Sequence, residues 1–536
     1  MFRGPPPRSR AARTATGAYC RAMAPLPQLP QLPPLSPPSR RAVLGAAAGA
    51  GLLLVGGGAR PHAASARAAV LPDRAPKLLL PARPGLVAAE NARTGSAGWR
   101  LGPRTTSDTD PRIKVYAADS AVPVGGRLRL KVSTSQARPF AAEIYRLGDY
   151  GGTGGRLVYR ADGIPGTRQA PAHLDRSSGT VTCAWSDTWQ TDVPEDWLPG
   201  LYTAVLADAD DVRTAVPFVV TDLPRAADYL VVLPTTTYQA YNEYPVDGAT
   251  GRSLYYGQDP ATRTSAAKLK ARVVSFDRPY AGAGLPQLFE LDHAFVRWAE
   301  ARGYDLAYAT SADLHAGRVD LRRYKAVVFP GHDEYWSQEM RARVEAASEA
   351  GVGLAFLTAN NVYWHVRMLP GADGTPDRLM RCNKDASSSH DRADPGPTVK
   401  WRDLHRPEQE LLGVQYVSVV KGEYPMGVRE SGHWFWSGTG VRDGDALPGM
   451  VWGEADRRFD ETARPRGEEV FLAGSPYRDA RGGAQRQQTG LYRAASGGLV
   501  FTAGTFRWPQ ALGDPRYADP RVGRATENLF AALVAR

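Results

Sequence analysis

Four short segments of this 536-residue chain concentrate side chains that could act as acids, bases or metal ligands. They span residues 234–244, 277–280, 331–337 and 358–364, and each follows a run of apolar residues. Tyrosine, asparagine, histidine and carboxylate groups recur in them, and such groups bind metal ions or transfer protons. The four segments are therefore candidates for one functional site.

Several familiar chemistries have no motif in this sequence. The patterns G-x-S-x-G, H-E-x-x-H, paired C-x-x-C and G-x-x-x-x-G-K-[ST] are all missing. The turn at 331–337 contains no cysteine, which excludes a thiol acyl-enzyme there. It offers His332, Asp333 and Glu334 at the start of an expected helix, where negative charge is favourable. On local grounds this pattern fits an acidic helix cap as well as a functional site.

The elements that would position these segments alternate between buried strands and helices. A helix is expected after residue 288, where apolar residues recur at three and four residues and Gly303 would end the helix. A second would begin at Ser337 and end at Gly351. The alternation predicts parallel strands with a site at their carboxyl ends. The expected strands are 229–233, 272–276, 305–309, 325–329 and 353–357.

Residues 113–222 have a different texture, with short alternating runs that are split by Gly, Pro and Asp. The run 127–132 has a period of two, and a segment of this length predicts a β-sandwich of immunoglobulin-like size. The Gly-rich stretch 150–156 precedes a strand-like run, so it predicts a hairpin turn and not a phosphate loop. Residues 67–112 lack periodicity and predict an irregular arm or linker.

The net charge of +11 suggests nucleic-acid binding only until its position is considered. Residues 1–66 hold eight arginines and no lysine or acidic residue, so the remaining chain has a net charge of +3. The pair Arg40-Arg41 precedes a short Gly-rich apolar run and small-residue cleavage sites, which is typical of a twin-arginine export signal. This apolar run is shorter than the roughly 20 residues of a stable membrane span. The true start is open between Met1 and Met23.

Two cysteines, Cys183 and Cys382, remain after the predicted signal. They lie in segments that we assign to different domains, so a disulfide is compatible with the sequence but not argued by it. Two buried free thiols are the expectation.

The motifs together resemble the C-terminal domain of the N,N-dimethylformamidase large (beta) subunit and its secreted relatives. The resemblance runs from about residue 113 to the C-terminus. Each motif alone is weak, whereas their joint order is specific. The blocks that carry it are EIYRLGDYGGTGGR (143–156), TTTYQAYNEY (235–244), SFDRPY (275–280), GHDEYWS (331–337), residues 360–364 and AGTFRW (503–508).

The resemblance implies a mononuclear iron centre held by two tyrosines and one carboxylate. By motif position the ligands would be Tyr241, Tyr280 and Glu334, with Tyr238 competing for the place of Tyr241 and Asp333 for that of Glu334. Phenolate and carboxylate oxygens are hard ligands that favour high-valent iron. Three protein ligands leave positions open for water and substrate.

Three further residues are candidates for catalytic roles, two of which, His332 and Asn360, resemble residues around the family's site. His332 and Asn360 would orient water or the developing oxyanion. Lys384 would polarise the substrate or move a proton.

The sequence thus predicts an α+β multidomain protein, with the sandwich at 113–222 followed at 225–536 by an α/β domain similar to the class I glutamine-amidotransferase-like fold. The expected function is an exported iron-dependent amidohydrolase that acts on a small amide. The alternative is a non-catalytic cell-envelope or glycan-binding protein that retains the fold. Nothing supports nucleic-acid binding, no small subunit is evident, and a homo-oligomer is compatible with the sequence.

Overall fold

The computed structural model describes residues 85–384 and 398–535, so the predicted export signal at 1–66 lies outside the described residues. Within the predicted arm, residues 85–112 include the short helix α1 (Leu86–Asn91). In the part of the chain that is described, no helix combines the length and the apolarity needed to span a bilayer.

Ten strands follow α1, and eight of them form two sheets that enclose one apolar core. The sheet orders are β1-β3-β8 and β2-β10-β9-β4-β5. Leu128, Leu130 and Val132 on β3 are fully buried and alternate with more exposed residues, as the period of two predicts. The strands are β1 (Ile113–Ala117), β2 (Ala121–Pro123), β3 (Arg127–Thr134), β4 (Phe140–Leu147), β5 (Gly155–Ile164), β6 (His173–Asp175), β7 (Thr180–Thr182), β8 (Trp189–Asp192), β9 (Gly200–Ala207) and β10 (Arg213–Thr221).

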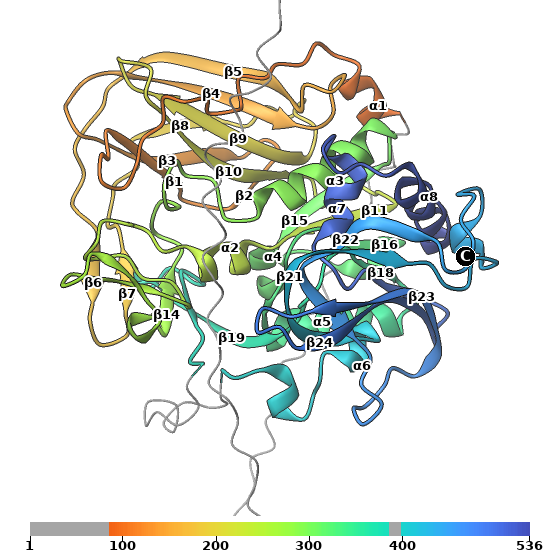
Figure 1. The fold of residues 1–536 in the computed structure, drawn as a ribbon. Helices are drawn as coiled ribbons and strands as arrows, with labels where there is room; N and C mark the ends of the chain where they lie inside the picture. The colour runs from red at the N-terminus through yellow and green to blue at the C-terminus, as the bar shows by residue number, and fades with distance from the viewer. Residues whose placement is uncertain (1–84, 385–397, 536) are drawn as a thin grey trace, which may run out of the picture. The chain divides into compact units, whose positions relative to one another are not determined.

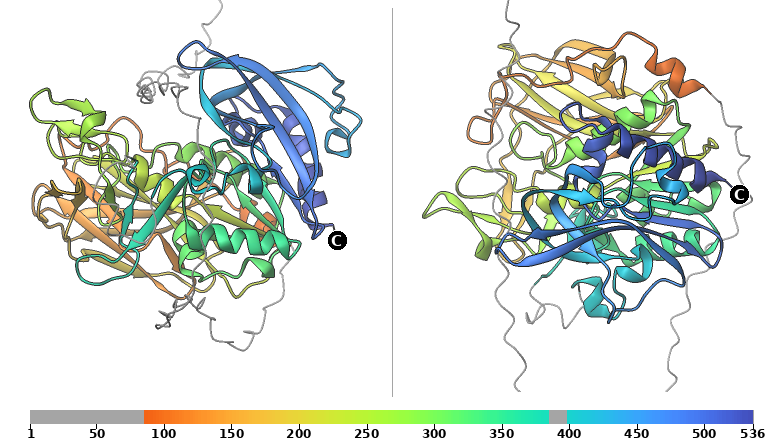
Figure 2. Two further views of the ribbon diagram at one scale, coloured as in Figure 1. Left: turned by 90° about the horizontal axis from the view of Figure 1, so that it is seen from below. Right: turned by 45° about the vertical axis from the view of Figure 1, so that its right-hand side comes forward.

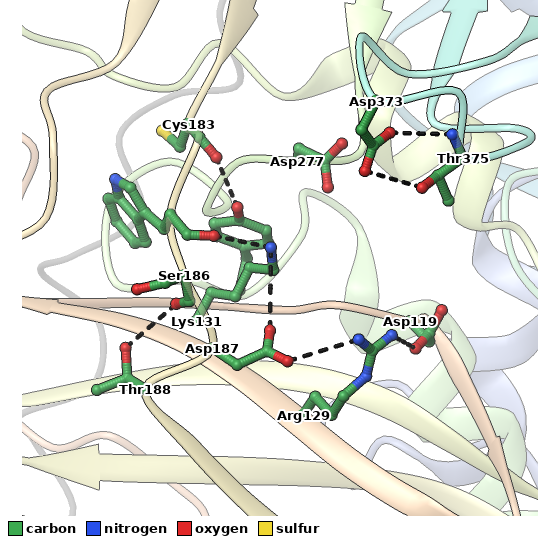
Figure 3. A network of polar contacts seen from close by, with 12 residues as sticks. Asp119, Arg129, Lys131, Cys183, Ser186, Asp187, Thr188, Asp277, Asp373 and Thr375 are labelled. Atoms are coloured by element: carbon green, nitrogen blue, oxygen red, sulfur yellow. Dashed lines mark hydrogen bonds and ion pairs between the residues drawn. The ribbon is translucent and has the colours of Figure 1, made fainter.

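The Gly-rich stretch 150–156 connects β4 and β5, which pair antiparallel, so the predicted hairpin turn is confirmed. Near β3, polar contacts hold the segment that precedes β8 (Figure 3). Arg129 donates to Asp119 at 2.9 Å and to Asp187 at 3.5 Å, and Lys131 donates to the carbonyl oxygen of Trp185 at 2.7 Å.

The C-terminal region is built around a seven-stranded sheet of order β15-β11-β16-β18-β25-β24-β23 (Figure 1). The first five of these strands are parallel, and β24 and β23 extend the sheet as an antiparallel hairpin. The strands are β11 (Tyr229–Leu233), β15 (Leu306–Thr310), β16 (Ala326–Phe329), β18 (Gly353–Phe356), β23 (Gly467–Arg478), β24 (Ala484–Ala494) and β25 (Leu499–Thr502).

This arrangement confirms a mixed α+β protein with a mostly parallel sheet. The immunoglobulin-like and glutamine-amidotransferase-like topologies stay predictions. The two views in Figure 2 show the long strands near the C-terminus, in blue, as a curved layer beside the green strands.

One predicted strand of the parallel sheet is wrong. The run 272–276 forms β14 (Val273–Ser275), which belongs to a separate four-stranded sheet of order β14-β20-β19-β17. There it pairs antiparallel with β20 (Leu379–Arg381). A short apolar run is compatible with either sheet, so only the long-range pairing distinguishes them. The other strands of this small sheet are β17 (Tyr335–Ser337) and β19 (Trp364–Leu369).

Both predicted helices are present. Helix α3 (Phe289–Ala301) ends two residues before Gly303, which has a φ of +68°. Helix α5 (Gln338–Glu349) begins after Ser337, whose side chain accepts the N–H of Met340 as an N-cap. The other helices are α2 (Thr235–Tyr241), α4 (Ser311–Ala316), α6 (Gln409–Leu412), α7 (Arg507–Gly513), α8 (Pro520–Val534) and the 3-10 turns at Ala267–Leu269, Leu321–Arg323, Trp401–Leu404 and Trp434–Trp436. The remaining strands are β12 (Gly257–Asp259), β13 (Thr264–Ala266), β21 (Gln415–Gly427) and β22 (Ala446–Arg457).

A buried ion pair joins the two sheet regions. Arg146 on β4 donates to both carboxylate oxygens of Glu300 on α3, at 2.6 and 2.7 Å, and both side chains are excluded from solvent. Tyr308 on β15 donates to the same carboxylate at 2.9 Å. Cys183 and Cys382 are buried and are not joined in a disulfide, as expected.

Candidate metal centre

Helix α2 starts directly after β11 and ends with Tyr241. Thr236 Oγ1 donates a hydrogen bond to the carbonyl oxygen of Tyr335 at 2.8 Å, and Thr237 Oγ1 accepts one from the backbone N–H of Glu334 at 3.0 Å. These two bonds tie α2 to the segment that follows β16. They place Tyr241 beside Glu334.

Three oxygen-bearing side chains converge at this position. The hydroxyl of Tyr241 donates to Glu334 Oε2 at 2.8 Å, and the hydroxyl of Tyr255 lies 2.8 Å from both oxygens of the same carboxylate. The two hydroxyl oxygens lie 3.0 Å apart. We call these three residues the oxygen cluster.

Tyr255 reaches the cluster from the loop between α2 and β12. The N–H of Leu254 donates to the carbonyl oxygen of Ala240 at 2.9 Å, which joins the loop to α2. The buried guanidinium of Arg278 donates to the carbonyl oxygen of Arg252 at 2.8 Å. These bonds hold the chain before Tyr255, and the N–H of Ser253 donates to the carbonyl oxygen of Tyr256 at 2.8 Å, so the loop is fixed around Tyr255.

The charges in the cluster oppose ionisation of its phenols. Burial and the negative charge of Glu334 raise the pKa of Tyr241 and of Tyr255 well above the ordinary value. Burial also acts to raise the pKa of Glu334, but the hydrogen bond from His332 and its charge outweigh burial, and the pKa is lowered. Glu334 is therefore the anion of the cluster, and the phenols are its donors.

His332 lies between two carboxylates. Its Nδ1 is 3.3 Å from the carbonyl oxygen of Ala359, which can only accept, so Nδ1 carries a proton. Its Nε2 lies 3.2 Å from Glu334 Oε2 and 3.8 Å from Glu454 Oε2. Burial acts to lower the pKa of His332, whereas the hydrogen bond to Glu334 and both carboxylate charges raise it, and the net shift is upward.

Glu454, on β22, adds a second carboxyl group. Its Oε2 accepts a hydrogen bond from Asn360 Nδ2 at 2.8 Å. Burial and the charge of Glu334 raise the pKa of Glu454 to about 8, against the opposing effect of His332. At neutral pH this group carries a proton that it can donate.

The backbone that presents Asn360 is strained. Asn360 and Val362 have φ values of +55° and +56°, a region that asparagine tolerates and β-branched valine avoids. The N–H of Asn360 donates to Asp456 Oδ1 at 2.9 Å, and that of Val362 donates to the carbonyl oxygen of Asp333 at 2.9 Å. Backbone strain of this kind is concentrated at functional sites.

Lys384 closes one side of the oxygen cluster. Its Nζ donates to the hydroxyl of Tyr335 at 2.7 Å and lies 3.3 Å from the centre of the Tyr255 ring. The ring centre of Trp364 is 4.8 Å from the same atom. Burial lowers the pKa of Lys384 to about 8, against the opposing effect of Glu334.

The structure thus brings together five of the six predicted site residues, and Tyr280 is the exception. The ring of Tyr280 packs edge-on against that of Tyr238, with centres 6.3 Å apart. Tyr238 in turn donates to Asp292 Oδ2 at 2.6 Å, so it points away from Glu334. None of the contacts described for Tyr280 joins it to the oxygen cluster, where Tyr255 stands instead.

The donor set of the cluster fits a hard metal cation. Among the described residues, no group of three or more His, Cys, Asp and Glu side chains is arranged to hold a metal, so a metal would need the phenol oxygens. One carboxylate and two phenols meet within hydrogen-bonding distance, and a nitrogen, His332 Nε2, lies 3.2 Å from both Glu334 Oε2 and the Tyr241 hydroxyl, so oxygens dominate the set. Such a set suits ferric iron better than zinc.

Comparison with known proteins identifies the family of this chain. The family profile described as N,N-dimethylformamidase beta subunit-like, C-terminal, matches residues 141–520, well over half of the chain. The chain belongs to this family. The N,N-dimethylformamidase beta subunit of an Alcaligenes species is 23% identical over 420 residues, and that of Paracoccus aminophilus is 24% identical over 427. Each alignment covers 65% of this chain and 54% of the relative.

The chain therefore spans about half the length of these dimethylformamidase subunits. Among solved structures, a superoxide reductase (neelaredoxin) from Ignicoccus hospitalis is 8% identical, with a TM-score of 0.12. That alignment covers 20% of this chain and 77% of the other, and a likeness this low carries no argument.

Two residues of the dimethylformamidase-like site escape sequence reasoning. Tyr255 follows no strand, so a search at strand ends passes over it. Glu454 lies within the long strand β22, where its inward direction depends on pairing with β21. The local sequence feature that could indicate Tyr255 is the adjacent pair Tyr255-Tyr256, which follows the block TTTYQAYNEY (235–244).

Proposed function

We propose that this protein is a mononuclear-iron-dependent amidohydrolase that cleaves the C–N bond of a small amide. The observation that carries the proposal is the convergence of Tyr241, Tyr255 and Glu334 on one point. Membership of the dimethylformamidase beta subunit-like family supports the same reaction class. In this proposal the three oxygens hold the iron, with Tyr255 in the place that the sequence motif assigned to Tyr280.

Bound iron would supply Lewis-acid chemistry, which polarises a carbonyl group and acidifies water. The two phenol protons would have to leave when the cation binds, since its positive charge would oppose the burial and the charge of Glu334 that raise their pKa. In the metal-free site His332 Nε2 donates to Glu334. Once the cation took up this carboxylate and Nε2 lost its proton, Nε2 would be placed to accept a proton from water, because Nδ1 is held by the carbonyl oxygen of Ala359.

Hydrolysis breaks the C–N bond, adds the water oxygen to the carbonyl carbon and requires a proton on the departing nitrogen. Glu454 is the donor that we assign to that nitrogen, because it is protonated at neutral pH and is held in place by Asn360. Lys384 would bind the amide oxygen or the negative charge that develops on it, since its ammonium lies against the ring of Tyr255.

We also propose that the protein is exported. The support is the paired Arg40-Arg41 before a short apolar run, and twin-arginine export of folded proteins suits an enzyme that acquires its metal in the cytoplasm. Mass spectrometry of the protein recovered outside the cytoplasm tests this: the N-terminus should lie near residues 64–68, and an intact leader on all of the protein would contradict it.

The function is tested by assaying formamide hydrolysis and iron content together. We expect hydrolysis by the iron-loaded protein and loss of both iron and hydrolysis in Glu334→Gln. Tyr159→Phe, on the exposed face of β5, is the control that should change neither. An iron-free protein that binds oligosaccharides and hydrolyses no amide would instead establish the non-catalytic alternative.

A further inference from the structure

A second feature, a basic pocket of about 290 Å³, lies next to the segments that carry the oxygen cluster. It is formed between the β6–β7 hairpin and the chain from Lys268 to Arg272. The described residues that line it include five cationic residues and no carboxylate. The cationic residues are Arg176, Arg252, Lys268, Lys270 and Arg272.

The walls of the basic pocket are joined by backbone contacts. The N–H of Arg272 donates to the carbonyl oxygen of Ser178 at 2.8 Å, and the guanidinium of Arg272 donates to the carbonyl oxygen of Ser177. Gly179 has a φ of +76°, and a Cβ there would lie 2.7 Å from Ala271 Cα. The hairpin is therefore fitted closely to the opposite wall, and the pocket is a built feature of the fold.

The positive charge in the pocket is only partly balanced by the protein. Arg252 is 6% exposed, and its Nη1 donates to the carbonyl oxygens of Gly251 and Gln258, at 2.8 and 2.6 Å, and not to a carboxylate. Burial lowers the pKa of Arg252, and the nearby charge of Arg176 lowers it further. A buried cation beside a like charge is costly unless an anion compensates it.

The acids around the pocket are already engaged. Asp175 accepts hydrogen bonds from Ser177 and Ser178, and Asp259 lies 3.8 Å from Lys268 Nζ. Glu243 accepts a hydrogen bond from Gln258 at 2.7 Å. The basic pocket therefore has capacity for an external anion.

The pocket lies near Lys384, because the charge of Lys270 in its lining acts on that ammonium. His332 and Glu334 are buried, whereas Tyr241, Tyr255 and Lys384 keep partial exposure. Of these, Tyr255 stands three residues after Arg252, and Lys384 stands two residues after Cys382, whose N–H donates to the carbonyl oxygen of Arg272 at 2.9 Å. Two residues of extended chain span about 7 Å, so the backbone of Lys384 lies within about that distance of Cys382.

We propose that the basic pocket binds the carboxylate of an acylated amino acid or short peptide while its amide lies at the oxygen cluster. This rests on the proposed amidohydrolase function and specifies its substrates as anionic amides. A formylated dipeptide is the simplest probe of this kind, because two residues separate its formyl carbon from its carboxylate by about 7 Å.

The test compares N-formylglycylglycine with its neutral carboxamide, which differs only in the terminal charge. We expect the wild-type kcat/KM to be at least about tenfold higher for the acid, a factor that corresponds to about 1.4 kcal/mol. The double variant Arg176→Gln/Lys268→Gln, changed at two exposed positions, should lose this preference through KM and keep its kcat for the carboxamide. Arg168→Gln/Lys421→Gln, which removes two exposed charges elsewhere, is the matched control.

Calorimetric titration separates this proposal from the function on which it rests. Both probes and inorganic phosphate are titrated into wild type and the double variant, whether or not hydrolysis occurs. Tighter binding of the acid that is lost in the double variant supports the pocket even if no amide is cleaved. Equal binding of acid and carboxamide overturns it, as does phosphate binding that leaves the acid's affinity unchanged. Hydrolysis of both probes at equal rates would leave the amidohydrolase function standing without the pocket.

Discussion

At the scale of single residues, the site depends on which groups surround the carboxylate of Glu334. Both phenols of the oxygen cluster donate to it, His332 lies 3.2 Å away, and Lys384 adds a positive charge. The buried Glu454 stands beyond His332, and burial together with the negative charge of Glu334 raises its pKa, so that it keeps its proton. The proposed function thus makes one carboxylate a ligand and the other an acid, although their chemistry in isolation is the same.

Replacing Glu454 by Gln tests this division of roles. The substitution keeps the size and the contact with Asn360 but removes the transferable proton, so kcat for formamide hydrolysis should fall by about 10² or more. The iron content should not change, because Glu454 is not a ligand. Glu468→Gln, at an exposed position of β23, is the matched control. A Glu454→Gln protein with normal kcat would remove Glu454 from the mechanism.

At the scale of secondary-structure elements, the parallel strands and the helices α3 and α5 follow from apolar periodicity and capping residues. The position of β14 does not follow, because its pairing with β20 joins residues more than a hundred positions apart. The position of β14 explains why Tyr280 is not the second phenol of the oxygen cluster. A search along the rim of the parallel sheet includes Tyr280, whereas the fold brings in Tyr255 from a loop.

His332, Glu334 and Asn360 were accessible to sequence reasoning because they directly follow β16 and β18. Glu454 was not, because its direction depends on the register of β21 with β22, which contains several irregularities. Long-range pairing, and not local propensity, therefore limits what the sequence alone can predict about this site.

Helix α3 contributes a buried acid whose titration should appear in stability. Burial and the charges of Asp333 and Glu290 raise the pKa of Asp292 to about 8, against the opposing effect of the hydrogen bond from Tyr238. Since this folded-state value exceeds the unfolded one, the protonated side chain favours the folded state. Its contribution is complete below about pH 4 and is lost as the pH rises towards 8.

Asp292→Asn removes this titration. The free energy of unfolding, measured with urea, should therefore rise in the variant relative to wild type by on the order of 1 kcal/mol for each pH unit between pH 5 and 8. Asp192→Asn, at the exposed Asp192 of β8, should follow wild type at every pH. A constant difference between Asp292→Asn and wild type across this range would show that Asp292 is ionised in the folded protein.

At the scale of the whole molecule, the sandwich and the parallel-sheet region share a buried polar network. Arg146 reaches across from β4 to Glu300, and Asn91 and Tyr308 donate to the same carboxylate. A carboxylate with this many donors is stable only while they remain in place. The two regions should therefore unfold as one cooperative unit.

The prediction concerns two arginines of the sandwich. Arg146→Met leaves Glu300 buried without its cation and should lower the free energy of unfolding by about 3–5 kcal/mol. Arg127→Met removes an exposed pair with Asp192, whose side chains are 56% and 71% exposed, and should cost less than about 1 kcal/mol. Urea unfolding followed by fluorescence measures both. Similar costs, or two separate transitions in wild type, would contradict a single cooperative unit.

The most direct test of the proposed metal centre is to measure the iron content and visible absorption of the purified protein and of two tyrosine variants. Phenolate bound to ferric iron absorbs visible light, so wild type should be coloured and hold iron in a one-to-one ratio with chains. Tyr255→Phe should lose the colour and most of the iron, whereas Tyr280→Phe should keep both. A colourless, iron-free wild type, or a Tyr255→Phe protein that keeps its colour, would contradict the assignment of Tyr241, Tyr255 and Glu334 as the metal centre.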